Sequence, residues 1–158
     1  MPTREAVFTA LFNAGGAMRW ETAPDSGEFH TLKETSRRIK LFSDVPADLQ
    51  PWLGQQEPDD QAVQVTGQHY KQTWKVQWII YHRAGDDPNS NPSVYTNQMV
   101  DAAFAALEPG LADPGRVENR NTLFGLVHHC YIDGRIFKDP GDIDNQALII
   151  VPITVLVP

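Results

Sequence analysis

The stretch that decides the fold runs from Tyr70 to His82 and reads Tyr70-Lys71-Gln72-Thr73-Trp74-Lys75-Val76-Gln77-Trp78-Ile79-Ile80-Tyr81-His82. Its apolar side chains recur at every second position, which is typical of a β-strand with one buried face. The opposite face is polar through Gln77 and turns apolar at Ile79 and Tyr81. We therefore interpret this stretch as the central strand of a sheet, covered on both faces at one end.

Two segments have the apolar spacing of amphipathic helices. The first follows a capping residue, Thr3, and ends at Gly15-Gly16. The second begins at Ser93 and ends near Leu107. The predicted buried positions are Val7, Phe8, Leu11 and Phe12 in the first helix and Val100, Ala103, Phe104 and Leu107 in the second.

A basic segment precedes the central strand. As a strand it would place Arg38 and Lys40 on one face and Arg37, Ile39 and Leu41 on the other. The basic face is either a solvated strand edge, where positive charge deters stray pairing, or a contact with another subunit or a partner protein.

The remaining segments alternate between predicted loops and strands. We expect a loop with a short extended piece at 17–28, one helical turn between Asp44 and Pro51, a hairpin tip at 54–61, and loops at 84–92, 109–123 and 138–145. Residues 126–137 read as a strand in which Asp133-Gly134 is a hairpin turn or, as we favour, a bulge. Residues 146–158 read as a strand buried on both faces, and Pro152 indicates an edge or a bulge there. Such a strand could join another subunit or be covered within the chain.

These elements predict an α+β fold, a mostly antiparallel sheet with two helices packed on one face. With 158 residues, the chain has the length of one domain, which we place at 1–158. No apolar run approaches the roughly 20 residues of a membrane span, so no membrane association is expected. The net charge of −7 argues against a protein that grips nucleic acid.

The candidate chemical groups give no positive indication of an enzyme. In a strand, His128 and Cys130 would point to one face and His129 to the other, and no motif supplies further metal ligands. Cys130 has no adjacent base or glycine elbow, and the acidic loops lack the spacing of a calcium site. We predict no cofactor and no metal. As the single cysteine, Cys130 excludes an internal disulfide, which favours folding in the cytoplasm.

The residues from Ser36 to Pro51 read SRRIKLFSDVPADLQP. This run resembles the segment SRR-x-K-x-(W/F)-x-DVP-x-x-x-QP of the tail terminator proteins of long-tailed bacteriophages, which are minor tail or tail completion proteins. The run from Val127 to Ile136, the apolar C-terminal strand and the first helix also resemble that family, and the longer segment 17–28 departs from it.

The resemblance implies a structural virion protein at the head-proximal end of the tail, assembled in the host cytoplasm. Such a protein forms a homohexameric ring that caps the tail tube, ends tube polymerisation and provides the joining surface to the head connector. Its implied partners are the tube protein and the connector protein, and DNA passes through the lumen without sequence-specific binding. Because each copy carries −7, we expect added salt or divalent cations to favour ring closure.

We assign contacts within this interpretation. The subunit interface is predicted to contain Arg37, Arg38 and Lys40, with Trp52 as an aromatic anchor. The predicted docking loops for the tube or connector contain Asp86, Asp87, Asn89, Asp139, Asp142 and Asp144. The alternatives are a head-side completion or connector ring protein and, from a different class, a small cytoplasmic enzyme that uses Cys130.

Overall fold

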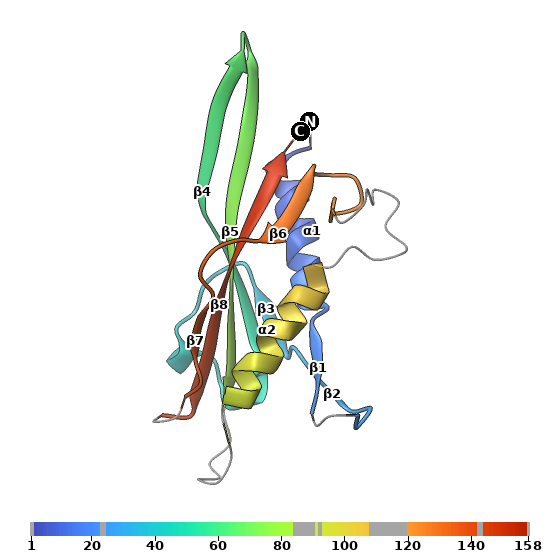
Figure 1. Ribbon diagram of the computed structural model, residues 1–158. Coiled ribbons are helices and arrows are strands. Elements are labelled where there is room, and N and C mark those ends of the chain that lie inside the picture. Colours follow the sequence, from blue (N-terminus) through green and yellow to red (C-terminus); the bar gives the residue numbers. More distant parts are fainter. Residues whose placement is uncertain are drawn as a thin grey trace.

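The computed structural model describes residues 2–22, 25–83, 91, 93–107, 120–141 and 144–157. In these ranges the protein has the predicted α+β fold, with two α-helices and eight β-strands (Figure 1). The helices are α1 (Arg4–Gly16) and α2 (Ser93–Leu107), and two 3₁₀ turns are η1 (Phe42–Asp44) and η2 (Ala47–Leu49). The strands are β1 (Arg19–Glu21), β2 (Phe29–Thr31), β3 (Glu34–Ser36), β4 (Trp52–Thr66), β5 (His69–Arg83), β6 (His129–Ile132), β7 (Phe137–Asp139) and β8 (Gln146–Val157).

The strand β5 is central, as its alternation predicts. The main sheet has the order β3-β4-β5-β8-β6, and β7 also pairs with β8. Only β3 and β4 run parallel, and the other described pairs are antiparallel. Strands β1 and β2 form a separate two-stranded sheet, so the extended piece expected within 17–28 is present as β1.

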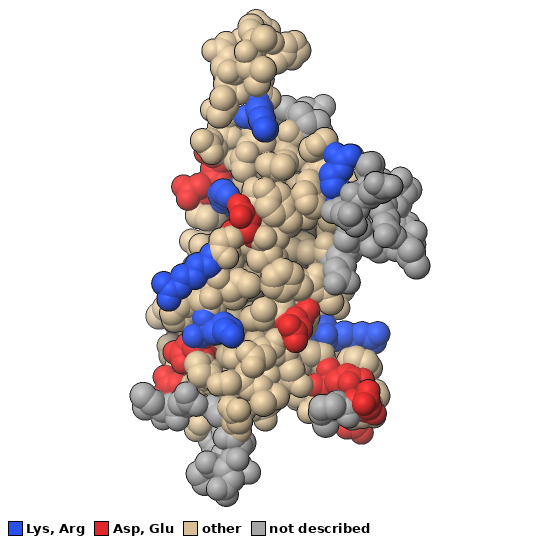
Figure 2. Space-filling model, in the orientation of Figure 1, with Lys and Arg blue, Asp and Glu red and all other residues tan. Residues whose placement is uncertain are grey.

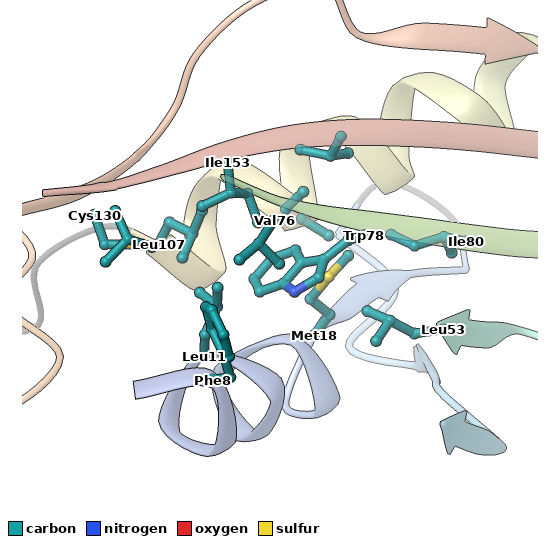
Figure 3. Close-up of a cluster of buried hydrophobic side chains, with 14 of the residues drawn as sticks. Phe8, Leu11, Met18, Leu53, Val76, Trp78, Ile80, Leu107, Cys130 and Ile153 are labelled. Carbon is teal, nitrogen blue, oxygen red and sulfur yellow. The ribbon is translucent and has the colours of Figure 1, made fainter. Parts of the chain in front are cut away.

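Both helices pack on the face of the sheet that carries Trp74, Val76, Trp78 and Ile80 (Figure 1). Trp78 is completely buried and lies with Phe8 and Leu11 of α1 in the middle of this cluster (Figure 3). The predicted face of α1 is therefore confirmed. In α2, Phe104 is 47% exposed, and Met99 and Ala102 are buried instead, so the predicted position of Phe104 is wrong.

The opposite face of β5 is covered at Ile79 and Tyr81, as expected. Its cover comes from the chain itself, since Phe42, Val45 and Leu49 of the 3₁₀ segment pack there with Trp52. The predicted single helical turn before Pro51 is thus realised as η1 and η2, and its apolar side chains close a second, smaller core.

The hairpin tip predicted at 54–61 is wrong. Strand β4 continues through these residues to Thr66, and the tip lies at Gly67, which has a φ of 52°. A shift of register between Gln56 and Asp59 leaves Pro58 out of the ladder, so the proline does not interrupt the strand. The chain therefore forms a much longer hairpin than its acidic and polar composition indicated.

The strand predicted over 37–41 is also wrong. Strand β3 ends at Ser36, whose hydroxyl accepts a hydrogen bond from the Arg38 amide at 2.9 Å and donates one to the Arg38 carbonyl at 2.8 Å. These two local bonds turn the backbone away from the sheet. The basic residues consequently lie in an irregular surface segment.

The C-terminal strand is not an edge strand, contrary to the expectation from Pro152. Strand β8 lies between β5 on one side and β6 and β7 on the other. The Pro152 carbonyl accepts a hydrogen bond from the Asp133 amide at 3.1 Å, within the break between β6 and β7. A proline fits here because its nitrogen, on the same side of the strand, faces that break. The favoured bulge at Asp133-Gly134 is confirmed, since β6 and β7 pair with the same strand and not with each other.

Candidate subunit interface

Arg37, predicted to contact another subunit, instead joins three parts of its own chain. Its guanidinium donates to Glu57 Oε1 on β4 at 2.8 and 3.1 Å and also bonds Glu5 on α1. The hydrogen bond from Arg37 lowers the pKa of the Glu5 carboxyl. The side chain is only 30% exposed. Arg37 therefore holds the basic segment onto the body of the protein.

A buried polar network continues from this ion pair into the core. Gln55 Nε2 donates to Glu57 Oε1 at 3.0 Å and to the Phe8 carbonyl at 2.9 Å. Its Oε1 accepts from Trp78 Nε1 at 3.1 Å. The completely buried Gln55 thus links α1, β4 and β5, a role that its place in the predicted hairpin tip concealed.

Lys40 is also neutralised within the chain. Its Nζ lies 3.1 and 3.2 Å from the two carboxylate oxygens of Glu34 on β3. The Tyr81 hydroxyl donates to the Lys40 carbonyl at 2.8 Å, which fixes the backbone of the segment over β5. Lys40 remains partly exposed at 36%.

Arg38 is exposed and has no ion-pair partner among the described residues. It is flanked by exposed aliphatic side chains, Ile39 at 37% and Leu41 at 69%. An open surface groove is lined by Arg38, Ile39, Lys40, Leu41 and Asp44. We call it the Arg38 groove. It combines a free guanidinium with apolar surface, a composition that favours contact with another protein.

Trp52 does not fulfil the predicted role of an exposed anchor. It is completely buried and stacks on Tyr81, with ring centroids 4.9 Å apart. A Cβ at Gly54 would lie 2.4 Å from the Trp52 ring, so only glycine leaves room for it. Trp52 therefore stabilises the smaller core and cannot reach a neighbouring subunit in this conformation.

The predicted docking loops are described only in part. Asp139 is the last residue of β7, so the loop predicted at 138–145 begins later than expected. Asp139 and Asp144 are exposed, and each accepts a hydrogen bond from a nearby backbone amide, that of Gly141 at 3.0 Å and that of Gln146 at 3.1 Å. Asp86, Asp87, Asn89 and Asp142 lie outside the described residues. Most of the predicted loop at 84–92 and most of the one at 109–123 lie outside them as well.

The feature that sequence reasoning missed is the far part of the β4–β5 hairpin. Fourteen consecutive residues, 58–71, are exposed, and we call them the arm. Figure 1 shows the arm projecting beyond the rest of the sheet. Val63, Val65 and Tyr70 are between 49% and 63% exposed there. The sequence does contain a signal for the arm, because Val63, Val65 and Tyr70 lie on either side of Gly67. From the sequence alone, these residues indicate only a lead into the central strand.

The candidate chemical groups are placed as follows. Cys130 is 1% exposed, and burial raises the pKa of its thiol to about 12, so it is not a ready nucleophile. His128 is exposed beside Arg120, while His129 Nδ1 accepts a hydrogen bond from the Asn121 amide at 3.2 Å. Within the described ranges, no three His, Cys, Asp or Glu residues are grouped to hold a metal ion. None of the helices described there could span a membrane.

No protein-family model matches the chain, and a search of curated proteins finds no match. The assignment of function therefore depends on the residues and their geometry.

Proposed function

We propose that this protein is a ring-forming structural subunit of a long-tailed phage virion. In this role, a ring of six copies caps the tail tube, ends tube polymerisation and offers a joining surface to the head connector. The observation that carries the proposal is the Arg38 groove. In the segment that resembles the tail terminator family, Arg38 has no ion-pair partner among the described residues and lines a groove together with the exposed Ile39 and Leu41.

The negative net charge of the chain makes this groove a candidate binding site for a second copy. In a protein of net charge −7, an exposed arginine without an acidic partner is a site at which a second acidic copy can bind. Arginine and apolar side chains are both enriched at the buried centres of interfaces. A contact between two different patches, repeated from copy to copy, closes into a ring when the rotation fits.

The acidic composition also suits the channel of such a ring. DNA that passes through the lumen would be repelled by the wall and would not stick to it. The tube protein and the connector protein would bind the two rims, where Asp139 and Asp144 are candidate contacts.

The test is Arg38→Glu, with Arg135→Glu as the matched control, because Arg135 is exposed and makes no ion pair among the described residues. We expect both variants to keep the wild-type circular dichroism spectrum. Arg38→Glu should sediment as a monomer, whereas Arg135→Glu should sediment with the wild-type ring. An intact ring in Arg38→Glu contradicts the assignment of this groove.

Placement in the virion needs a separate experiment. Particles assembled without the protein should carry overlong tails in electron micrographs if it is a terminator. Tails of normal length on unstable heads would instead indicate a connector.

A further inference from the structure

The arm needs a partner that its own chain does not supply. A two-stranded hairpin open on both faces is marginally stable in water, because neither face buries apolar surface. All residues from 58 to 71 are exposed, and the nearest ties to the body lie at its base, where Arg4 bonds Asp60 at 2.7 Å and Gln72 at 3.1 Å. On the β4 side, β3 pairs only with Trp52–Gly54, so the edge of the arm has no described strand beside it.

The charges of the arm differ from those of the rest of the chain. Residues 61–70 contain no Asp, Glu, Lys or Arg, and the end of the arm at the top of Figure 2 carries neither red nor blue. This uncharged end of the arm can approach an acidic protein without repulsion. At its base, Asp59 is exposed and has no ion-pair partner in the described part of the chain.

The composition of the arm complements that of the Arg38 groove. Asp59 and Val63 lie on the same face of β4, opposite Lys75 and Lys71 in an unbroken register. The arm thus presents one free carboxylate followed by exposed valines. The groove presents one free guanidinium, that of Arg38, followed by the exposed Ile39 and Leu41.

The end of the arm lies far from the groove of its own copy, and no ion pair joins Asp59 to Arg38 among the described residues. Arg37 anchors the groove segment at Glu57, and the tip at Gly67 is ten residues further along, which is about 30 Å of extended strand. In Figure 1 the arm and the 3₁₀ segment next to the groove lie toward opposite ends of the molecule. Complementary patches at two separate places produce a head-to-tail contact, the kind that closes rings.

We propose that the arm of one copy lies in the Arg38 groove of a second copy, with Asp59 against Arg38 and the arm valines against Ile39 and Leu41. This inference rests on the proposed ring and specifies which surfaces close it. The interface is then formed by a β-hairpin that only becomes covered on assembly.

The test uses disulfide formation between two separately made variants, Val63→Cys and Leu41→Cys. The native Cys130 is buried, so the introduced thiols are the reactive ones. Mixing the variants under oxidising conditions should yield a covalent dimer that contains one chain of each kind. Either variant oxidised alone should stay free of covalent dimer. Val94→Cys mixed with Leu41→Cys is the matched control, because Val94 is 47% exposed on α2, away from the arm.

A charge exchange supplies the second measurement. Asp59→Lys should dissociate the ring as Arg38→Glu does, and the double variant should recover it. If rings form but neither the mixed disulfide nor this recovery is observed, the arm contact is wrong and the proposed function is unaffected. A wild-type chain that is monomeric overturns both.

Discussion

Arg37 and Arg38 are adjacent residues of the same type with opposite environments. The Ser36 hydroxyl turns the backbone, so that Arg37 meets Glu57 and Glu5 while Arg38 faces solvent. A guanidinium between two carboxylates stabilises the folded chain, whereas one without a partner is available to another molecule. The alternation of residues 37–41 predicts only that the two arginines lie on opposite faces of a strand, and the turn at Ser36 is what separates their roles.

His82 is the residue whose protonation should limit stability in acid. It is buried beside His30, with ring centroids 5.2 Å apart, and its Nδ1 has no hydrogen-bond partner among the residues that the structure describes. Burial first, and the charge of His30 second, lower the pKa of His82 to about 4. The unfolded chain binds this proton near pH 6.5. Its contribution to stability is therefore complete above about pH 6.5 and is lost as the pH falls toward 4.

We predict that His82→Phe, which keeps a ring against Tyr95, removes most of this dependence. Between pH 7 and pH 4, the wild type should lose roughly 2–3 kcal/mol more unfolding free energy than the variant. Urea denaturation at several pH values measures the difference. If the unfolding free energy changes with pH in the same way in both proteins, His82 is not the cause of the pH dependence.

At the scale of elements, the contact of α1 with β5 depends on the absence of a side chain. A Cβ at Gly15 would lie 2.9 Å from the Trp78 ring and 3.2 Å from Leu53 Cδ1. The neighbouring Gly16 has open space, with Thr35 Cγ2 at 3.8 Å. The helix can therefore approach the sheet closely only along the line of Gly15.

This pair of glycines gives a matched prediction. Gly15→Ala should lower the unfolding free energy by about 1–3 kcal/mol, because the core around Trp78 must shift. Gly16→Ala should leave stability unchanged or raise it by up to about 1 kcal/mol, since alanine favours the helix. Equal effects of the two substitutions in chemical denaturation would mean that the contact with Trp78 is not tight.

The elements with strong apolar periodicity were predictable. Strand β5 and helices α1 and α2 each bury one face, and the positions of that face repeat in the sequence. Strand β4 was not predictable over 58–66, because both of its faces are exposed there and no buried face leaves a pattern in the sequence. The interior place of β8 was hidden by Pro152, whose missing amide hydrogen loses no ladder hydrogen bond because it faces the break between β6 and β7.

The candidate interface was predictable only in part. The basic composition of 37–40 indicated a contact surface, and Arg38 is free to make one. The burial of Trp52 depends on residues 42–49 folding back over Tyr81, a contact between segments that single-residue patterns do not encode. The arm was missed because its residues are exposed on both faces, so no buried face marks them in the sequence.

At the scale of the whole molecule, charge should control assembly. Six copies of net charge −7 repel one another, and one Arg38 contact per interface offsets only part of this repulsion. Salt at 0.1 M reduces interactions beyond about 10 Å. We therefore predict that sodium chloride or magnesium increases the ring fraction in sedimentation velocity runs. A ring fraction that falls as salt rises would contradict this balance of charges.

The central claim is that the protein works as a ring, and its native mass tests this most directly. Native mass spectrometry or light scattering at moderate salt should give six times the chain mass of 17.7 kDa. A particle that stays at 17.7 kDa over the accessible range of protein concentration and salt would contradict the proposal that the protein forms a ring.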